Sequence, residues 1–274
     1  MLIIGLTGGL ATGKSTVSSI LSSPPHNLPI VDADVLARKV VEPGTSGYNA
    51  IVKHFGPTTP DLLVPAGPEM PEAGPLGKGR PLNRPALGRR VFGDSAEVKK
   101  DRARLNGIVH PAVRWEAYKA LLWAYLGGHW AVVWDVPLLF EVGIDRLCGA
   151  VVVVSVRDPA VQMERLRARD PHLSAEDAEN RVRSQMDVRV KARRCEARGK
   201  GRGVVVLNDG DKEELRRGVD RALAEIRGRS PWWWGTALWV CPALAVAAGV
   251  WTVAVNWRAG KRWEKEEAVE RAKL

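Results

Sequence analysis

The sequence predicts an α/β protein built on a parallel β-sheet. Three observations indicate this fold: short runs of apolar, largely β-branched residues recur along the chain, helical patterns separate them, and a glycine-rich loop follows the first run. Strands that helices cover on both faces are apolar along their whole length, as these runs are. The predicted strands comprise residues 2–6, 29–31, 131–134, 150–154 and 204–207, and the predicted helices residues 15–21, 97–124 and 159–169. Ser174 and Asp177 are expected to open a further helix.

The glycine-rich loop follows the pattern G-x-x-x-x-G-K-S over residues 8–15, between a predicted strand and a predicted helix. Glycines let backbone N–H groups turn towards an anion, and the amino end of the helix adds a positive dipole. Lys14 is expected to contact the β- and γ-phosphates of a nucleoside triphosphate, and the Ser15 hydroxyl to bind Mg²⁺. A turn that only closes a hairpin is the alternative, but strand, spacing and helix coincide here. The residues expected to hold the nucleotide are Gly8, Gly9, Leu10, Ala11, Thr12, Gly13, Lys14, Ser15 and Thr16.

The composition limits the possible partners. The formal net charge of +10 over 274 residues favours acidic partners such as phosphates, nucleic acid or an anionic lipid surface. No basic block interleaved with aromatic residues is present, so we do not expect nucleic-acid binding. The three cysteines, Cys148, Cys195 and Cys241, are widely spaced and fit a reducing compartment without a metal site. Because the first strand begins at residue 2, we do not expect a signal or transit peptide.

Acidic residues follow two of the predicted strands. Asp32 and Asp34 come after residues 29–31, and Asp135 comes after residues 131–134. Ligands of open α/β sheets bind at the carboxyl ends of the strands. We therefore expect Asp32 and Asp34 to lie beside the glycine loop, with at least one of them acting on the hydroxyl of an acceptor. The alternative for this pair is capping of the helix that follows.

Two segments depart from the strand–helix pattern. Residues 57–81 are dense in proline and glycine and lack a period, so they predict an exposed, mobile loop, either a functional lid or a surface insertion. Residues 232–257 contain no charged residue and are long enough to cross a membrane, with tryptophans at both ends. We expect one transmembrane helix over residues 230–257, in which Pro242 is tolerated, and a short polar tail over residues 258–274. A buried core helix is the alternative.

Several motifs narrow the chemistry. The D-x-x-G and N-K-x-D motifs of GTPases are absent from the sequence. Instead, "GLTGGLATGKSTV", "VDADVLARKVVEPG", "LNRPALGRRVF", "LNGIVHPAV", "VWDVPLLFE" and "QMERLRAR" occur in this order, and together they resemble the dephospho-CoA kinase family. The resemblance covers residues 1–56 and 82–210. It implies a three-layer P-loop kinase fold within residues 1–229, with helical substrate and lid regions, and transfer of the γ-phosphate of ATP, with Mg²⁺, to the ribose 3′-hydroxyl of dephospho-CoA. That transfer is the last step of coenzyme A synthesis.

The resemblance also implies roles for single residues. Asp34 matches the catalytic base of the family, and Asp32 lies beside it to bind metal or substrate. Arg38 and His110 are expected to bind the substrate, although His110 can equally cap a helix before Pro111. Arg165 and Arg169 match lid arginines, with Arg165 acting on the transferred phosphoryl group and Arg169 binding ATP, whereas Arg167 is expected to lie on a solvated face. Asp135 is expected to hold Mg²⁺ together with Ser15.

Two rival interpretations of the function remain open. A related kinase with another hydroxyl acceptor, such as a nucleoside, and a membrane-anchored ATP-binding scaffold without turnover both fit the glycine loop alone.

A single C-terminal anchor over residues 232–257 predicts a membrane protein whose catalytic part faces the cytosol, on the mitochondrial outer membrane or the endoplasmic reticulum.

Overall fold

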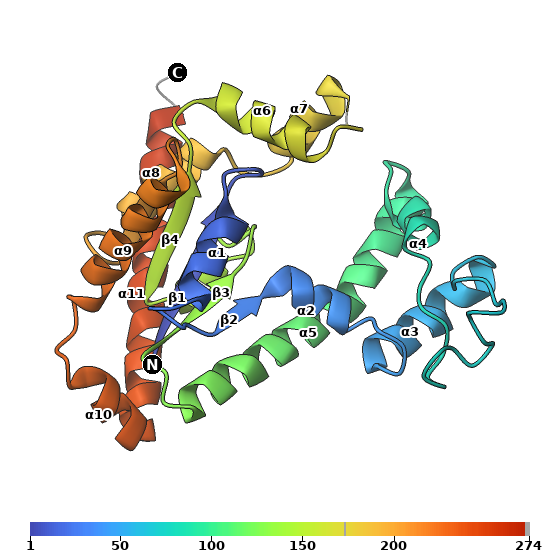
Figure 1. Cartoon of the computed structure of the whole chain (residues 1–274), viewed down its shortest axis with the longest axis horizontal. Helices are drawn as coiled ribbons and strands as arrows, with labels where there is room; N and C mark the ends of the chain where they lie inside the picture. Colours follow the sequence, from blue (N-terminus) through green and yellow to red (C-terminus); the bar gives the residue numbers. More distant parts are fainter. Residues whose placement is uncertain (173, 272–274) are drawn as a thin grey trace. The chain divides into compact units, whose positions relative to one another are not determined.

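The computed structural model, which describes residues 1–172 and 174–271, contains a five-stranded sheet. The strand order is β2-β3-β1-β4-β5 (Figure 1). Strand β1 pairs in parallel with β3 and β4, and β4 pairs in parallel with β5. The strands are β1 (Leu2–Gly8), β2 (Ile30–Asp32), β3 (Ala131–Asp135), β4 (Ala150–Ser155) and β5 (Gly203–Leu207). The α/β fold with a parallel sheet is therefore confirmed, and each predicted strand is present within two residues of its expected ends.

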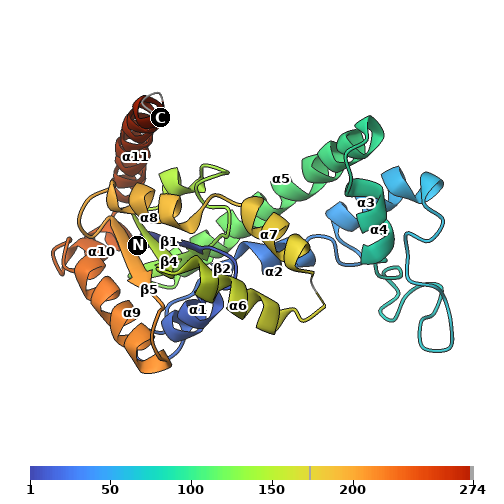
Figure 2. The ribbon, with the colours of Figure 1, turned by 90° about the horizontal axis from the view of Figure 1, so that it is seen from above.

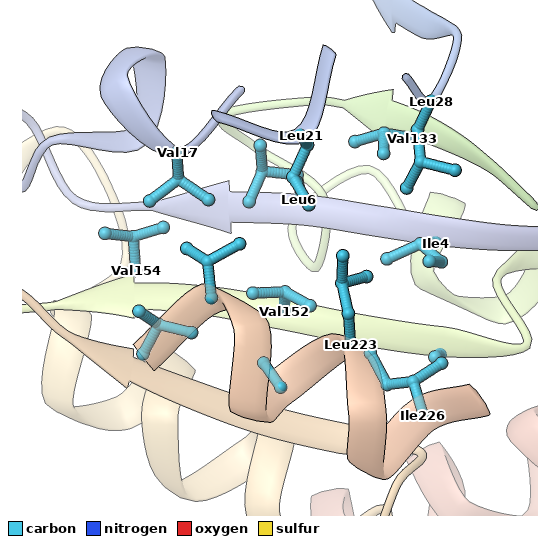
Figure 3. Close-up of a cluster of buried hydrophobic side chains, with 14 of the residues drawn as sticks. Ile4, Leu6, Val17, Leu21, Leu28, Val133, Val152, Val154, Leu223 and Ile226 are labelled. Carbon is cyan, nitrogen blue, oxygen red and sulfur yellow. The ribbon is translucent and has the colours of Figure 1, made fainter. Parts of the chain in front are cut away.

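Helices cover both faces of this sheet, which is why its strands are apolar throughout. Seen from above, α1 (Lys14–Ser22) and α9 (Lys212–Arg227) lie on one side of the sheet and α8 (Val188–Glu196) on the other (Figure 2). The side of α1 and α9 holds the main core, in which Val17 and Leu21 of α1 meet Leu223 and Ile226 of α9 over the strands (Figure 3). All four of these side chains are at most 6% exposed.

The chain divides into two compact units, and the sheet belongs to the first. This unit comprises Met1–Val31 and Trp123–Leu274. Besides the elements above it contains η2 (Ile144–Leu147), α6 (Pro159–Arg169), α7 (Ala175–Arg183), α10 (Trp234–Val240) and α11 (Pro242–Arg271). The predicted helix over residues 159–169 is confirmed. Ser174 caps α7, because its hydroxyl accepts a hydrogen bond from the Asp177 N–H at 3.0 Å.

The second unit, Asp32–Leu122, is helical. It contains α2 (Ala33–Lys39), α3 (Ser46–Phe55), η1 (Gly56–Thr58), α4 (Arg84–Val91) and most of α5 (Ala96–Leu126). Its core joins Ile51 and Phe55 of α3 to Leu62 and Val91, each at most 4% exposed. The long helix predicted over residues 97–124 is confirmed as α5, which continues through Pro111.

The proline-rich segment 57–81 has little regular structure but is fixed to α3 and to the start of α4. The hydroxyl of buried Tyr48 donates to the Arg80 carbonyl at 2.7 Å, and the Asn83 N–H donates to the Leu62 carbonyl at 2.7 Å. The predicted exposure of the segment is confirmed at positions such as Leu76, which is 82% exposed. The predicted exposure is wrong at Leu62, which fills the core of the unit.

The C-terminal segment does not form one continuous helix. Helix α10 ends at Val240, Cys241 has φ −118° and ψ 90°, and α11 begins at Pro242. The ring of a proline disfavours helical geometry at the preceding residue, and here Pro242 starts a second helix instead of continuing the first. Within the described residues no single helix is long and apolar enough to cross a membrane. Helices α10 and α11 meet that length and composition requirement together, bent by 117°.

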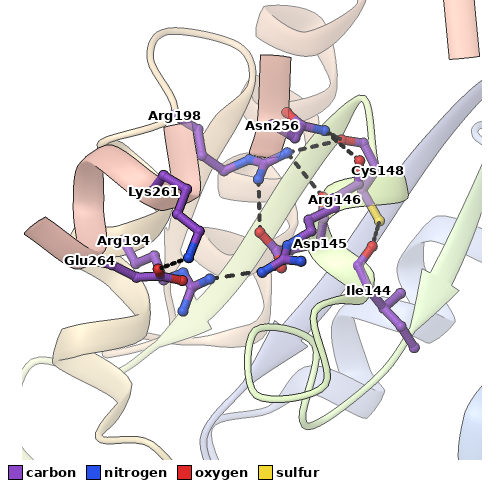
Figure 4. Close-up of polar contacts among 9 residues, drawn as sticks. All are labelled: Ile144, Asp145, Arg146, Cys148, Arg194, Arg198, Asn256, Lys261 and Glu264. Atoms are coloured by element: carbon purple, nitrogen blue, oxygen red, sulfur yellow. Dashed lines mark hydrogen bonds and ion pairs between the residues drawn. The ribbon is translucent and has the colours of Figure 1, made fainter. Parts of the chain in front are cut away.

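A buried asparagine fixes α11 to the sheet unit. Asn256 is 1% exposed, and its Nδ2 donates to the carbonyls of Arg146 at 2.9 Å and Cys148 at 2.8 Å, next to η2 (Figure 4). Its Oδ1 accepts a hydrogen bond from Arg202 Nη2 at 2.7 Å. Beneath it, Arg198 pairs with Asp145 at 3.1 Å, and burial raises the pKa of that carboxyl. Helix α11 is thus packed on the sheet unit through polar contacts.

Candidate active site

The glycine loop joins β1 to α1 at the carboxyl edge of the sheet. Gly13 has φ +92°, in the left-handed region that favours glycine, and Ala11 shares that region with φ 57°. A Cβ on Gly8 would lie 2.7 Å from the Val154 carbonyl, so the loop passes too close to β4 for a side chain there. The Thr12 hydroxyl donates to the Gly9 carbonyl at 2.9 Å. This backbone directs the first N–H groups of α1, which have no intrahelical acceptor, towards a bound anion.

Three side chains from distant parts of the chain support the loop. Asn208, just after β5, donates through Nδ2 to the Thr12 carbonyl at 2.9 Å. Arg165 of α6 donates to the Asn208 carbonyl at 2.8 Å, so this predicted site residue lies close to the loop. Gln162, one turn earlier on α6 and 6% exposed, donates to the Leu10 carbonyl at 2.8 Å. Gln162 is not among the predicted site residues, although it lies within the "QMERLRAR" segment.

Lys14 and Asp135 form the charged centre of the site. The Lys14 ammonium makes an ion pair with the Asp135 carboxylate, whose side chain is 1% exposed. Asp135 ends β3, which lies directly beside β1, so the strand order brings this carboxylate to the loop. The expectation that the strand before Asp32 lies beside the glycine loop is wrong, because β3 separates β2 from β1. Ser15 is exposed in the first turn of α1.

A cavity of about 590 Å³ opens between the glycine loop and the α6–α7 segment. Gly9, Leu10, Gln162, Arg183 and Arg189 are among the residues that line it. Asp187, also on its wall, accepts a hydrogen bond from Arg189 at 3.0 Å, and this bond lowers the pKa of the Asp187 carboxyl. The volume is in the range of sites for small organic ligands.

The other predicted arginines of α6 are more exposed than Arg165. Arg167 is exposed, as expected for a solvated helix face. Arg169, the last residue of α6, is 55% exposed and pairs with Asp170 at 3.0 Å. In this structure a neighbouring carboxylate holds the Arg169 guanidinium, and the predicted contact with ATP stays a prediction.

The remaining predicted residues belong to the helical unit. Asp32 caps α2, because its Oδ1 accepts hydrogen bonds from the N–H groups of Asp34 at 2.8 Å and Val35 at 3.1 Å. Asp34 is exposed in the first turn of α2, and Arg38 is exposed one turn later. His110 is exposed within α5, so the alternative in which it caps a helix before Pro111 is wrong, since the helix continues through both residues.

The three cysteines are free thiols. Cys148 and Cys195 are buried, and burial raises the pKa of each thiol to about 12. Among residues 1–172 and 174–271, no three His, Cys, Asp or Glu side chains are grouped to hold a metal ion. Ser15 and Asp135 offer hydroxyl and carboxylate oxygens of the kind that Mg²⁺ prefers, and two protein ligands are enough where substrate phosphates supply others.

A parallel sheet with a glycine loop, its lysine and an acidic residue on the neighbouring strand defines the chain as a P-loop kinase. Within that class, the chain belongs to the dephospho-CoA kinase family, whose model matches residues 2–214. It is 45% identical over 196 residues to a curated dephospho-CoA kinase of Saccharomyces cerevisiae, covering 72% of this chain and 73% of the relative. It is 42% identical over 229 residues to the dephospho-CoA kinase of Anaeromyxobacter dehalogenans, covering 83% and 93%.

Solved structures share the fold. A crystal structure of a protein from Thermus thermophilus aligns with a TM-score of 0.58 at 30% identity, covering 82% of this chain and 97% of that one. A dephospho-CoA kinase from Campylobacter jejuni aligns with a TM-score of 0.57 at 24% identity, covering 83% and 98%. The expected P-loop kinase fold is thereby confirmed. The family match ends before α10 and α11, so these two helices lie outside it.

Proposed function

We propose that this chain transfers the γ-phosphate of ATP to the ribose 3′-hydroxyl of dephospho-CoA, giving coenzyme A and ADP in the final step of coenzyme A biosynthesis. One observation carries the proposal: in a chain of this family, the phosphate loop is intact and its Lys14 meets Asp135 of the adjacent strand. A P-loop kinase needs these two charges and a donor loop to hold a triphosphate.

Asp34 is the proposed base for the acceptor hydroxyl. Its neighbour Asp32 uses a carboxylate oxygen to cap α2, whereas Asp34 stands exposed in the first turn of that helix. Arg38, on the next turn, and His110 supply positive or hydrogen-bonding groups that suit an anionic substrate. Arg165 contributes positive charge to the transferred phosphoryl group, since it already lies beside the glycine loop through Asn208.

Ser15 and Asp135 are the proposed holders of Mg²⁺. The Asp135 carboxylate is buried, and a buried carboxylate requires a counter-charge, which Lys14 supplies in this structure. If Lys14 contacted the phosphates of ATP, the buried Asp135 carboxylate would need another positive partner, and together with the Ser15 hydroxyl it would hold Mg²⁺. When bound, Mg²⁺ neutralises the charge on the phosphates.

The test compares two carboxylates of the helical unit in the full chain. ADP formation is followed with ATP, Mg²⁺ and dephospho-CoA for the unchanged protein, Asp34→Asn and the control Asp61→Asn, whose exposed side chain pairs with Arg89. Loss of a general base lowers the rate by about 10²- to 10⁴-fold, so we expect this loss for Asp34→Asn alone. ADP formation that does not depend on dephospho-CoA, or that nucleosides support equally well, contradicts the proposed acceptor.

We also propose that the C-terminal segment attaches the enzyme to a membrane, with the catalytic part in the cytosol, at the mitochondrial outer membrane or the endoplasmic reticulum. The uncharged run over residues 232–257 and the exposure of Trp232 (93%) and Trp251 (68%) support attachment. A span over this run requires Asn256 to leave its carbonyl partners, so docking and insertion compete. A fluorescent fusion of residues 225–274 that stays diffuse in the cytosol contradicts the proposal.

A further inference from the structure

A fully buried lysine lies behind the phosphate loop. Lys191 of α8 is 0% exposed, although lysine is among the residues least often buried. Its Nζ donates to the Pro137 carbonyl at 2.8 Å and lies 3.0 Å from Glu141 Oε1. Burying an ammonium group is costly, so the fold retains this charge only with close partners.

The carboxylate that pairs with Lys191 also holds the end of the α6–α7 segment. Glu141 Oε1 accepts a hydrogen bond from the Met186 N–H at 3.2 Å. Met186 lies between α7 and α8, where the chain returns from the α6–α7 segment to the sheet. One carboxylate oxygen thus contacts both the buried ammonium group and the base of that segment.

The carbonyl that accepts from Lys191 lies in the loop that carries Asp135. Pro137 is two residues beyond Asp135, and its carbonyl also accepts a hydrogen bond from the Thr7 hydroxyl at 2.9 Å. Thr7 is buried and immediately precedes Gly8 of the phosphate loop. Burial lowers the pKa of Lys191, its pairing with Glu141 raises it, and the nearby positive charge of Lys14 lowers it further. Lys191 therefore lies within electrostatic reach of the catalytic lysine.

We propose that Lys191, paired with Glu141, is a positioning residue that fixes the base of the α6–α7 segment against the loop bearing Asp135. The other end of the α6–α7 segment is α6, where Gln162 and Arg165 contact the Leu10 and Asn208 carbonyls. With its base fixed, α6 holds these two side chains beside the phosphate loop, where ATP binds. The expected change in KM for ATP rests on the proposed function. The fixed base of the α6–α7 segment rests on the geometry alone.

Three variants distinguish a role of Lys191 in positioning the α6–α7 segment from a role in the stability of the fold alone. Lys191→Met keeps the length of the side chain and removes the ammonium group. The double variant Lys191→Met, Glu141→Gln also removes the carboxylate charge that would otherwise lose its ammonium partner, while the glutamine oxygen still accepts from the Met186 N–H. Arg193→Met is the control, because Arg193 is a basic residue of the same helix with a 57% exposed side chain. Urea unfolding shows which variants are folded, and the double variant carries the test if the single variant is not.

The expected result is a split between the two substrates. For the folded Lys191 variants we expect KM for ATP to rise at least about tenfold, equivalent to about 1.4 kcal/mol, while KM for dephospho-CoA stays within about twofold. Hydrogen exchange should accelerate in peptides from α6 and α7 but not in β4. A double variant with the ATP affinity, KM values and exchange of the unchanged protein overturns the proposal and leaves Lys191 a structural ion pair.

The proposed function and this inference fail in different ways. If the unchanged protein and Arg193→Met both bind ATP but show no ADP formation that depends on dephospho-CoA, the proposed acceptor is wrong. The inference is then decided by calorimetric titration with ATP and by hydrogen exchange. Weaker ATP binding with faster exchange in α6 and α7 supports the role of Lys191, and unchanged binding with unchanged exchange overturns it.

Discussion

Replacing Asn256 by leucine tests whether α11 is part of the folded kinase. The change keeps the branched shape of the side chain but removes two donated hydrogen bonds, to the Arg146 and Cys148 carbonyls, and one accepted from Arg202. The Cys148 carbonyl retains a hydrogen bond from Arg198 at 2.9 Å. The loss of the hydrogen bond from Asn256 to this carbonyl therefore costs the least free energy of the three. A neutral hydrogen bond contributes about 1 kcal/mol and one to a charged group about 2 kcal/mol, which gives an expected destabilisation of about 3 to 4 kcal/mol.

The assay is urea unfolding of the full chain, followed by far-ultraviolet circular dichroism. Ala254→Leu is the control, because it adds an apolar side chain at an exposed position of the same helix without touching η2. We expect Asn256→Leu to unfold at a lower urea concentration with an unchanged slope, and Ala254→Leu to unfold like the unchanged protein. Equal stability of all three proteins refutes the reasoning and means that α11 is not docked on the sheet unit in solution.

Three further predictions concern the loop, the charged centre and the thiols. Gly13→Ala places a Cβ 2.2 Å from Asn208 Nδ2 at φ +92°, so calorimetric titration should show ATP affinity at least about tenfold lower, with Gly249→Ala unaffected. Asp135→Asn should lower the rate of ADP formation about a hundredfold and raise the Mg²⁺ concentration that gives half the maximal rate; an unchanged Mg²⁺ requirement contradicts its role. Because burial raises the pKa of Cys148 from 9.0 to about 12, only the unfolded state loses this proton between those values, and the free energy of unfolding falls as the pH rises above 9. Cys148→Ala should reduce the loss of stability between pH 8 and pH 10 by about 1.4 kcal/mol relative to the unchanged protein, and Cys241→Ala, at an exposed thiol, should not.

Local patterns predicted the elements of the fold well. The five apolar runs are the five strands, and the helices over residues 97–124 and 159–169 are present as α5 and α6. Strand order could not be predicted in the same way, because it depends on which strands pair across long stretches of chain. Strand β3 lies between β2 and β1, so Asp135, and not the end of β2, is next to the glycine loop.

The site shows the same division between local and distant determinants. The spacing of the glycine motif predicts the loop and Lys14, since neighbouring residues alone define them. Gln162 and Lys191 act through the Leu10 and Pro137 carbonyls, which lie 152 and 54 residues away in the sequence. A polar side chain on a helix does not reveal which distant carbonyl it contacts, so periodicity could not assign either residue.

The C-terminal helix explains why hydropathy and structure emphasise different properties of one segment. Hydropathy counts apolar residues without regard to the direction in which they point. On α11, the side towards η2 carries Asn256 with Ala259 and Gly260, whereas Val250 and Trp251 are 65% and 68% exposed. Some large apolar side chains of α11 are thus exposed, whereas Trp263 lies on the same side as Ala259 and Gly260. In the proposed membrane attachment, a docked α11 lying along the membrane surface would keep the Asn256 hydrogen bonds, whereas a span would break them.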